Sequence, residues 1–161
     1  MPETQIVISN TTPLLYLERV GRLDLLKSLY GEICVSRAVV AELDAGGALA
    51  FDVRRIDWIA IREVCLPEPL AHIADLGAGE ASTVALALES PKRSLVLIDD
   101  RLGRKIAASY GLRLTGTGGL LIAAKQRGLV PAIKPVLNAL VVAGFYLRPR
   151  HLDDLCRLAG E

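Results

Sequence analysis

The sequence predicts a single three-layer α/β/α domain, in which helices cover both faces of a central, mainly parallel sheet. Short apolar stretches typical of strands alternate with segments whose apolar residues recur at helical spacing. Strands separated by helices require right-handed crossovers, which build parallel sheets buried on both faces. The chain has 161 residues, of which 52% are hydrophobic, so we expect one domain spanning residues 1–161.

Composition limits the classes of function. The formal net charge is +1, so affinity for nucleic acid would have to come from a local patch. The three cysteines, Cys34, Cys65 and Cys156, are widely spaced and odd in number. They indicate reduced core thiols in a cytoplasmic protein, not a disulfide framework or a zinc site. Residues 1–5 lack the pattern of a signal peptide, and no apolar run reaches the ~18 residues of a membrane span.

The first half of the chain contains three predicted strands, over residues 5–9, 32–35 and 57–64. After the first strand, hydroxyl side chains precede Pro13, which is typical of a helix start and predicts a helix over residues 14–19. A second helix is predicted over residues 23–29. Ser36 is expected to cap a third, whose apolar residues follow helical spacing. Residues 66–69 contain two prolines and are predicted to form a loop.

The second half repeats the alternation of strand and helix. Two glycines open an alanine-rich helix over residues 80–89, and a strand over residues 94–98 follows. The remaining predicted elements are a helix over 101–109, a strand over 112–115, a glycine-rich turn at 116–119 and helices over 120–127, 133–143 and 151–158.

Polar side chains are predicted at the edge of the sheet where ligands bind. In open parallel sheets this is the edge formed by the carboxyl ends of the strands. Asn10 directly follows the first strand, and Asp99 and Asp100 directly follow the fourth. Adjacent acids in such a place repel each other unless a positive group compensates. Glu42 and Glu80 lie on predicted helices, where solvation or the field of a helix start also explains an acid.

Taken together, these residues describe a site for a hard cation. The candidate metal ligands and catalytic residues are Asn10, Glu42, Glu80, Asp99 and Asp100. Oxygen ligands, with too few histidines and cysteines for zinc, predict Mg²⁺ or Mn²⁺. Such ions hydrolyse phosphodiesters by lowering the pKa of a bound water and by neutralising charge on the phosphate.

Candidate substrate-binding residues lie next to these acids. Arg101, Arg104 and Lys105 form a basic run that suits an RNA backbone, although a solvated helix face explains it equally well. Thr11 and Thr12 could contact substrate, and helix capping is the alternative role for both.

Five segments resemble those of PIN-domain proteins, in particular the prokaryotic PIN-like group known as domain of unknown function 3368. In order, they are residues 7–15 (VISNTTPLL), 35–43 (VSRAVVAEL), 76–81 (LGAGEA), 97–101 (LIDDR) and 116–121 (GTGGLL). The resemblance implies a metal-dependent ribonuclease fold that acts on RNA. It also implies a protein that is often dimeric and often the toxin of a toxin–antitoxin pair, with a small antitoxin protein as partner.

The resemblance assigns a position to each candidate acid. Asn10 stands after the first strand, where PIN domains usually place an aspartate. Glu42 and Glu80 match the second and third acids. Asp100 fits the fourth, and Asp99 is the alternative because a shift of one residue at the strand end exchanges them.

The departure at Asn10 leaves two classes of function open. An amide oxygen can coordinate a cation, but it supplies no negative charge and cannot act as a base. One class is a metal-dependent ribonuclease with a weakened site. The other is a PIN-like scaffold that binds RNA or a partner protein without cleaving.

The C-terminal region suggests a homodimer. An apolar helix over residues 135–143 is followed by Phe145, Tyr146 and Leu147, which are expected to be exposed. An exposed apolar patch on a small protein often marks an interface.

Overall fold

A five-stranded, all-parallel sheet forms the centre of the molecule in a computed structural model that describes residues 3–46 and 51–161. The strand order is β3-β2-β1-β4-β5, which places β1 in the middle. The strands are β1 (Ile6–Ser9), β2 (Ile33–Ser36), β3 (Ile59–Arg62), β4 (Ser94–Leu97) and β5 (Arg113–Thr115). The parallel sheet predicted from the sequence is therefore confirmed, with strand ends that differ by one or two residues from the predicted ones.

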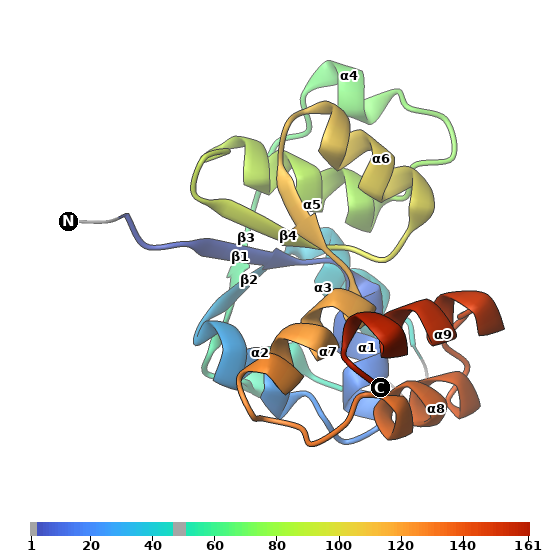
Figure 1. Cartoon of the computed structure of the whole chain (residues 1–161). Coiled ribbons are helices and arrows are strands. Elements are labelled where there is room, and N and C mark those ends of the chain that lie inside the picture. The colour runs from blue at the N-terminus through green and yellow to red at the C-terminus, as the bar shows by residue number, and fades with distance from the viewer. Residues whose placement is uncertain (1–2, 47–50) are drawn as a thin grey trace.

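Helices cover both faces of this sheet (Figure 1). One face carries α4 (Glu68–Ala71), α5 (Ala78–Leu88) and α6 (Arg101–Ser109). The other carries α1 (Thr11–Arg19), α2 (Asp24–Tyr30), α3 (Arg37–Asp44), α7 (Thr117–Gln126), α8 (Lys134–Val142) and α9 (Pro149–Leu158). The three-layer α/β/α fold is the one that the sequence predicts.

The core consists of two apolar clusters, one on each face of the sheet. Successive residues of a strand point to opposite faces. Accordingly Val7 packs with the layer that contains α1 and α7, whereas Ile8 packs with the layer that contains α5 and α6. Leu97 and Val96 of the neighbouring β4 divide in the same way. Because both faces are covered, the central strands read as continuous apolar runs in the sequence.

Three predictions about where helices begin and where loops lie are wrong. Helix α1 begins at Thr11, not at residue 14, because Asn10 and not a threonine takes the N-cap position. Residues 68–71 form the single helical turn α4, because Pro69 stands in its first turn, where a missing N–H leaves no hydrogen bond unmade. The predicted glycine-rich turn reduces to Gly116, and α7 already begins at Thr117.

Ser36 caps α3 as predicted. Its Oγ accepts a hydrogen bond from the Val39 N–H at 3.1 Å, which satisfies one of the unpaired donors at the start of the helix. The cap fixes where α3 starts, and therefore fixes the position of Glu42 on it.

The C-terminal helices pack more closely than the sequence suggests. Phe145 and Leu147, expected to be exposed, are half-buried because they pack against the apolar core. The Phe145 ring meets Tyr16 edge-on, with ring centroids 5.4 Å apart. Exposed apolar side chains remain at Val142, with 89% of its surface exposed, and at Tyr146, with 85%.

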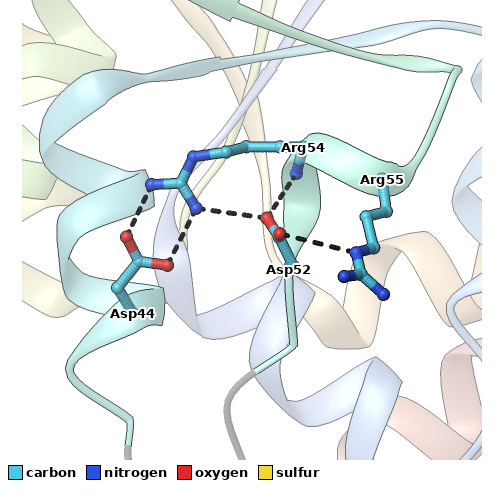
Figure 2. Close-up of polar contacts among 4 residues, drawn as sticks. All are labelled: Asp44, Asp52, Arg54 and Arg55. Atoms are coloured by element: carbon cyan, nitrogen blue, oxygen red, sulfur yellow. Dashed lines mark hydrogen bonds and ion pairs between the residues drawn. The ribbon is translucent and has the colours of Figure 1, made fainter.

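An exposed ion-pair network follows α3 (Figure 2). The guanidinium of Arg54, in the short 3₁₀ helix η2 (Val53–Arg55), binds both carboxylate oxygens of Asp44, at 2.7 and 3.1 Å. It also binds Asp52 at 3.1 Å. These hydrogen bonds raise the pKa of Arg54 and lower that of Asp44. The network ties the end of α3 to η2, on either side of residues 47–50.

Two of the three cysteines have the predicted core position. Cys34 and Cys156 are buried, but Cys65 is exposed because it follows β3 in a surface segment. Among the residues that the structure describes, no helix is long and apolar enough to cross a membrane.

Candidate metal centre

The candidate site lies at the edge where the parallel strands end. Helices α1, α3, α6 and α7 begin within four residues of the strands that precede them, so their first turns gather at this edge. Asn10 joins β1 to α1, and its backbone N–H donates to Leu97 O of β4 at 2.9 Å. The adjacency of β1 and β4 brings Asn10 and the Asp99-Asp100 pair, far apart in sequence, to neighbouring strand ends.

The Asn10 side chain is fully buried and binds Glu80. Its Nδ2 donates to Glu80 Oε1 at 3.2 Å, whereas its Oδ1 has no hydrogen-bond partner among the described residues. The side chain makes no capping bond to α1, so it does not hold the turn through the following amides. A buried, unpaired oxygen is rare in proteins and calls for an explanation.

Glu42 is held in place by two donors from different elements. The Thr11 hydroxyl donates to Glu42 Oε2, and the Gly79 N–H donates to Oε1 at 2.9 Å. A Cβ at residue 79 would lie 2.5 Å from Glu42 Oε2, so only glycine lets the first turn of α5 approach the carboxylate this closely. Asn10 and Thr11 are consecutive in the chain, as are Gly79 and Glu80, so these contacts are next to one another. Asn10, Thr11, Glu42 and Glu80 are together called the carboxylate cluster.

A pair of serines outside the predicted set supports this cluster. Ser36 Oγ and Ser82 Oγ lie 2.6 Å apart in a buried hydrogen bond between α3 and α5. Ser82 Oγ also lies 3.0 Å from Gly79 O, to which it can donate. The serines thus connect the helices that carry Glu42 and Glu80. Neither serine was predicted for this role, since serines at these positions have no distinctive spacing.

Asp99 is held by Thr117 at the start of α7. The Thr117 N–H donates to Asp99 Oδ1 at 2.7 Å, and its hydroxyl donates to Oδ2 at 2.6 Å. Burial raises the pKa of the Asp99 carboxyl, although the Thr117 bonds and the charge of Arg104 oppose the shift. Sequence reasoning missed Thr117. Its signal is a hydroxyl residue two positions after β5, the strand that neighbours β4.

Asp100 has a different environment from its neighbour. It is exposed and stands at the N-cap of α6, where its Oδ2 accepts from the Gly103 N–H at 2.7 Å. The repulsion expected between adjacent acids is therefore relieved by separate partners, because the chain turns between them.

The basic residues that follow these acids also differ in their environment. Arg104 turns inward and donates to Ile98 O at 2.9 Å, so it supports the turn that follows β4. Arg101 and Lys105 are exposed. Thr12 is half-buried in the first turn of α1, next to Thr11 of the carboxylate cluster.

The structure therefore groups some of the predicted ligands and leaves others apart. Glu80 binds Asn10 and Glu42 binds the adjacent Thr11, whereas Asp99 and Asp100 have partners of their own. Across residues 3–46 and 51–161, no three His, Cys, Asp or Glu side chains form a group that could hold one metal ion. The donors present are nonetheless oxygens, and the unpaired Asn10 Oδ1 is an atom that a cation would satisfy. The donor chemistry thus fits Mg²⁺ or Mn²⁺.

A groove of about 790 Å³ runs beside the cluster, between α5 and the segment after β3. Ser36, Ser82 and Ala78 contribute to its wall, together with the exposed Cys65. None of the five predicted ligands is among the described residues that line it. The groove is therefore a neighbour of the carboxylate cluster and not its cavity.

Comparison with known families agrees with this fold. No curated protein matches the sequence. The family model for domain of unknown function 3368, which is described as a PIN domain, matches residues 6–161. This range includes all five strands and every residue of the carboxylate cluster. The resemblance seen in the sequence motifs is confirmed, and the chain belongs to the PIN-domain family, in the group of domain of unknown function 3368.

Proposed function

We propose that this chain is a Mg²⁺- or Mn²⁺-dependent endoribonuclease centred on the carboxylate cluster. Membership of the PIN-domain family supports a nuclease-type fold, and this family is typically dependent on divalent metals. The observation that carries the proposal is the fully buried Asn10 side chain, whose amide holds Glu80 while its Oδ1 lacks a partner. A bound cation would give that oxygen the partner it lacks.

The residues of the cluster have distinct roles in this proposal. Glu42, Glu80 and Asn10 Oδ1 would hold the ion, and Asp99 and Asp100 would act as flanking acids. A divalent cation bound there would lower the pKa of a bound water and neutralise charge on the scissile phosphate. Thr11 and the Gly79 N–H orient the Glu42 carboxylate.

A second function is favoured by the same residues. Asn10 replaces an acid, and the described acids do not form a group of three. Both features favour a PIN-like scaffold that binds RNA or a partner protein without cleaving it. The two functions differ in whether the bound cation supports hydrolysis.

Cleavage of labelled RNA separates the two functions. We expect cleavage in Mn²⁺, none in EDTA, and a loss in Glu80→Gln. The matched control is Glu89→Gln, which removes the same charge at the exposed far end of α5. Control and parent should cleave equally. If the parent binds RNA and leaves it intact in Mn²⁺ and in Mg²⁺, the scaffold function holds instead.

The family resemblance also motivates a biological context, that of a cytoplasmic toxin with a small antitoxin protein as partner. The reading frame next to the gene should then encode such a partner. Growth arrest on expression of this chain should be relieved by co-expression of that partner and should be absent in Glu80→Gln. Growth arrest that persists in Glu80→Gln would show that toxicity does not come from the proposed site.

A further inference from the structure

Helix α9 extends past the edge of the sheet on which the carboxylate cluster lies. Helices α7 and α9 run in the same direction. A Cβ on Gly118 of α7 would lie 2.7 Å from Leu155 of α9, and Lys125 at the other end of α7 pairs with Glu161 at 3.2 Å. Helix α7 starts at the edge itself, where Thr117 binds Asp99. The α9 residues before Leu155 therefore overhang this edge, and Figure 1 shows this end projecting beyond the sheet.

The length of the overhang follows from helix geometry. Helix α9 begins at Pro149, six residues before Leu155. At a rise of 1.5 Å per residue, the first residue of α9 lies about 9 Å beyond the contact of Leu155 with Gly118, the second residue of α7. The first turn of α9 therefore lies beyond the ends of the strands.

The tip of this overhang is basic. Arg148, Arg150 and His151 are all exposed, and no ion pair among the described residues includes either arginine. The acids of α9 lie further from the tip. Asp153 is exposed, and Asp154 is paired with Arg157 at 3.2 Å. The positive charge is thus concentrated at the end that projects past the sheet.

Basic side chains therefore stand in both helical layers at the edge of the sheet where the carboxylate cluster lies. Arg101 and Lys105 project from the start of α6 in one helical layer, and Arg148 and Arg150 from the tip of α9 in the other. Two positive segments on opposite layers suit an extended polyanion better than a single phosphate. The net charge of the chain is only +1, so this distribution, and not the total charge, would attract a nucleic acid.

We propose that Arg148 and Arg150 bind the phosphate backbone of a single-stranded RNA substrate as it leaves the carboxylate cluster. This inference rests on the proposed function and adds the path that the RNA takes across the protein. Phosphate contacts give affinity without sequence preference, and each one releases counterions from the RNA. The contribution of α9 should therefore appear in the salt dependence of binding.

The test measures binding of a fluorescent oligouridine to Glu80→Gln protein, in which cleavage is blocked. Adding Arg148→Gln and Arg150→Gln should reduce the slope of log affinity against log salt by about 1.4, at roughly 0.7 per phosphate on a single strand. The loss of affinity should then grow about 25-fold for each tenfold dilution of the salt. Arg148→Lys with Arg150→Lys should keep the slope of the parent.

The matched control removes two charges at the opposite edge of the sheet. Lys92 precedes β4 and Arg113 begins β5, and both are exposed. Lys92→Gln with Arg113→Gln should leave the slope unchanged, and melting curves should show that all variants fold. An unchanged slope in the Arg148→Gln, Arg150→Gln protein would overturn the role of α9 and leave the proposed ribonuclease intact. A parent that binds no oligouridine at any salt concentration would overturn both.

Discussion

Asn10 determines how the carboxylate cluster behaves without a metal. In the structure its Nδ2 donates a hydrogen bond to Glu80, so the neutral amide stabilises that carboxylate when no cation is bound. An aspartate in its place would have no such donor. It would place a second carboxylate, in a fully buried position, beside Glu80. Asparagine therefore favours a stable metal-free fold and weakens the attraction for a cation.

We predict opposite effects of Asn10→Asp with and without metal. In EDTA the variant should be less stable than the parent by at least about 1 kcal/mol, because a buried hydrogen bond is replaced by repulsion between like charges. In Mn²⁺ it should recover, bind the ion more tightly and cleave RNA faster in Mg²⁺. Thermal melting with and without Mn²⁺, and cleavage rates, measure these effects.

The chain offers a control with the same chemical change. Asn138 lies exposed on α8, so Asn138→Asp alters the charge equally but far from the cluster. It should leave metal affinity unchanged. If Asn10→Asp folds well and shows no gain in metal affinity or cleavage over Asn138→Asp, then Asn10 lies outside the metal site and the scaffold function is favoured.

Asp99 and Asp100 show how far neighbouring residues can differ. One carboxylate accepts two hydrogen bonds from Thr117 at the start of α7, and the other caps α6. The Asp-Asp sequence alone does not distinguish the two residues. Their separate roles follow from the turn after β4, which directs one side chain inward and the other to solvent.

At the scale of elements, Glu161 holds the start of α8. Its carboxylate accepts from the Ile133 N–H at 2.7 Å and from the Lys134 N–H at 3.2 Å. Helix α8 has no side-chain cap of its own, so these bonds satisfy donors that are otherwise unpaired. The bond from the Ile133 N–H is the main cause that lowers the pKa of the Glu161 carboxyl, and Lys125 adds to it.

This contact makes the stability of the molecule depend on pH in a defined direction. A carboxyl whose pKa is lower in the folded state stabilises the fold above its unfolded pKa, which is about 4.3 for glutamate. That stabilisation is lost as the pH falls through the folded pKa. We therefore predict that Glu161→Gln lowers the melting temperature at pH 7 and that the difference shrinks toward pH 3.

The control for this prediction is Glu18→Gln, which removes an exposed carboxylate from α1. It should leave the melting temperature nearly unchanged at both pH values. If Glu161→Gln shows the same difference from the parent at pH 3 as at pH 7, the contact with α8 does not depend on the ionised carboxylate.

At the scale of the whole molecule, metal binding should stabilise the fold. A cation that binds only the folded state adds roughly 2.7 kcal/mol at a hundredfold excess over its dissociation constant. We predict that Mn²⁺ raises the melting temperature of the parent, and raises that of Glu80→Gln by less. The Glu89→Gln control should respond as the parent does. A melting curve that millimolar Mn²⁺ leaves unmoved would contradict a shared metal site.

We also predict a homodimer that forms through the exposed apolar end of α8. Val142 and the nearby Tyr146 expose most of their surface, and burying them against a second copy would remove apolar area from water. Light scattering at micromolar concentration should give twice the mass of one chain. Val142→Glu with Tyr146→Glu should give one chain mass, whereas Leu158→Glu, at the exposed end of α9, should not. A monomeric parent would contradict this prediction.

Much of the architecture is determined by the sequence itself. Apolar runs such as residues 94–98 identify buried strands, and the intervening helices require parallel crossovers. The Ser36 cap and the strand-end positions of Asn10 and Asp99 are also local properties. Local signals were insufficient at residues 68–71 and 116–119, because proline and glycine are tolerated in the first turn of a helix as well as in loops.

The partners within the site were decided only by tertiary structure. Three contacts depend on strand order and on the close approach of helices. They join Glu80 to Asn10, Glu42 to the Gly79 N–H, and Asp99 to Thr117. The overhang of α9 likewise depends on its register against α7. Sequence patterns report the local conformation and burial of each segment. Contacts between distant residues arise only when the segments pack, so they belong to the folded molecule.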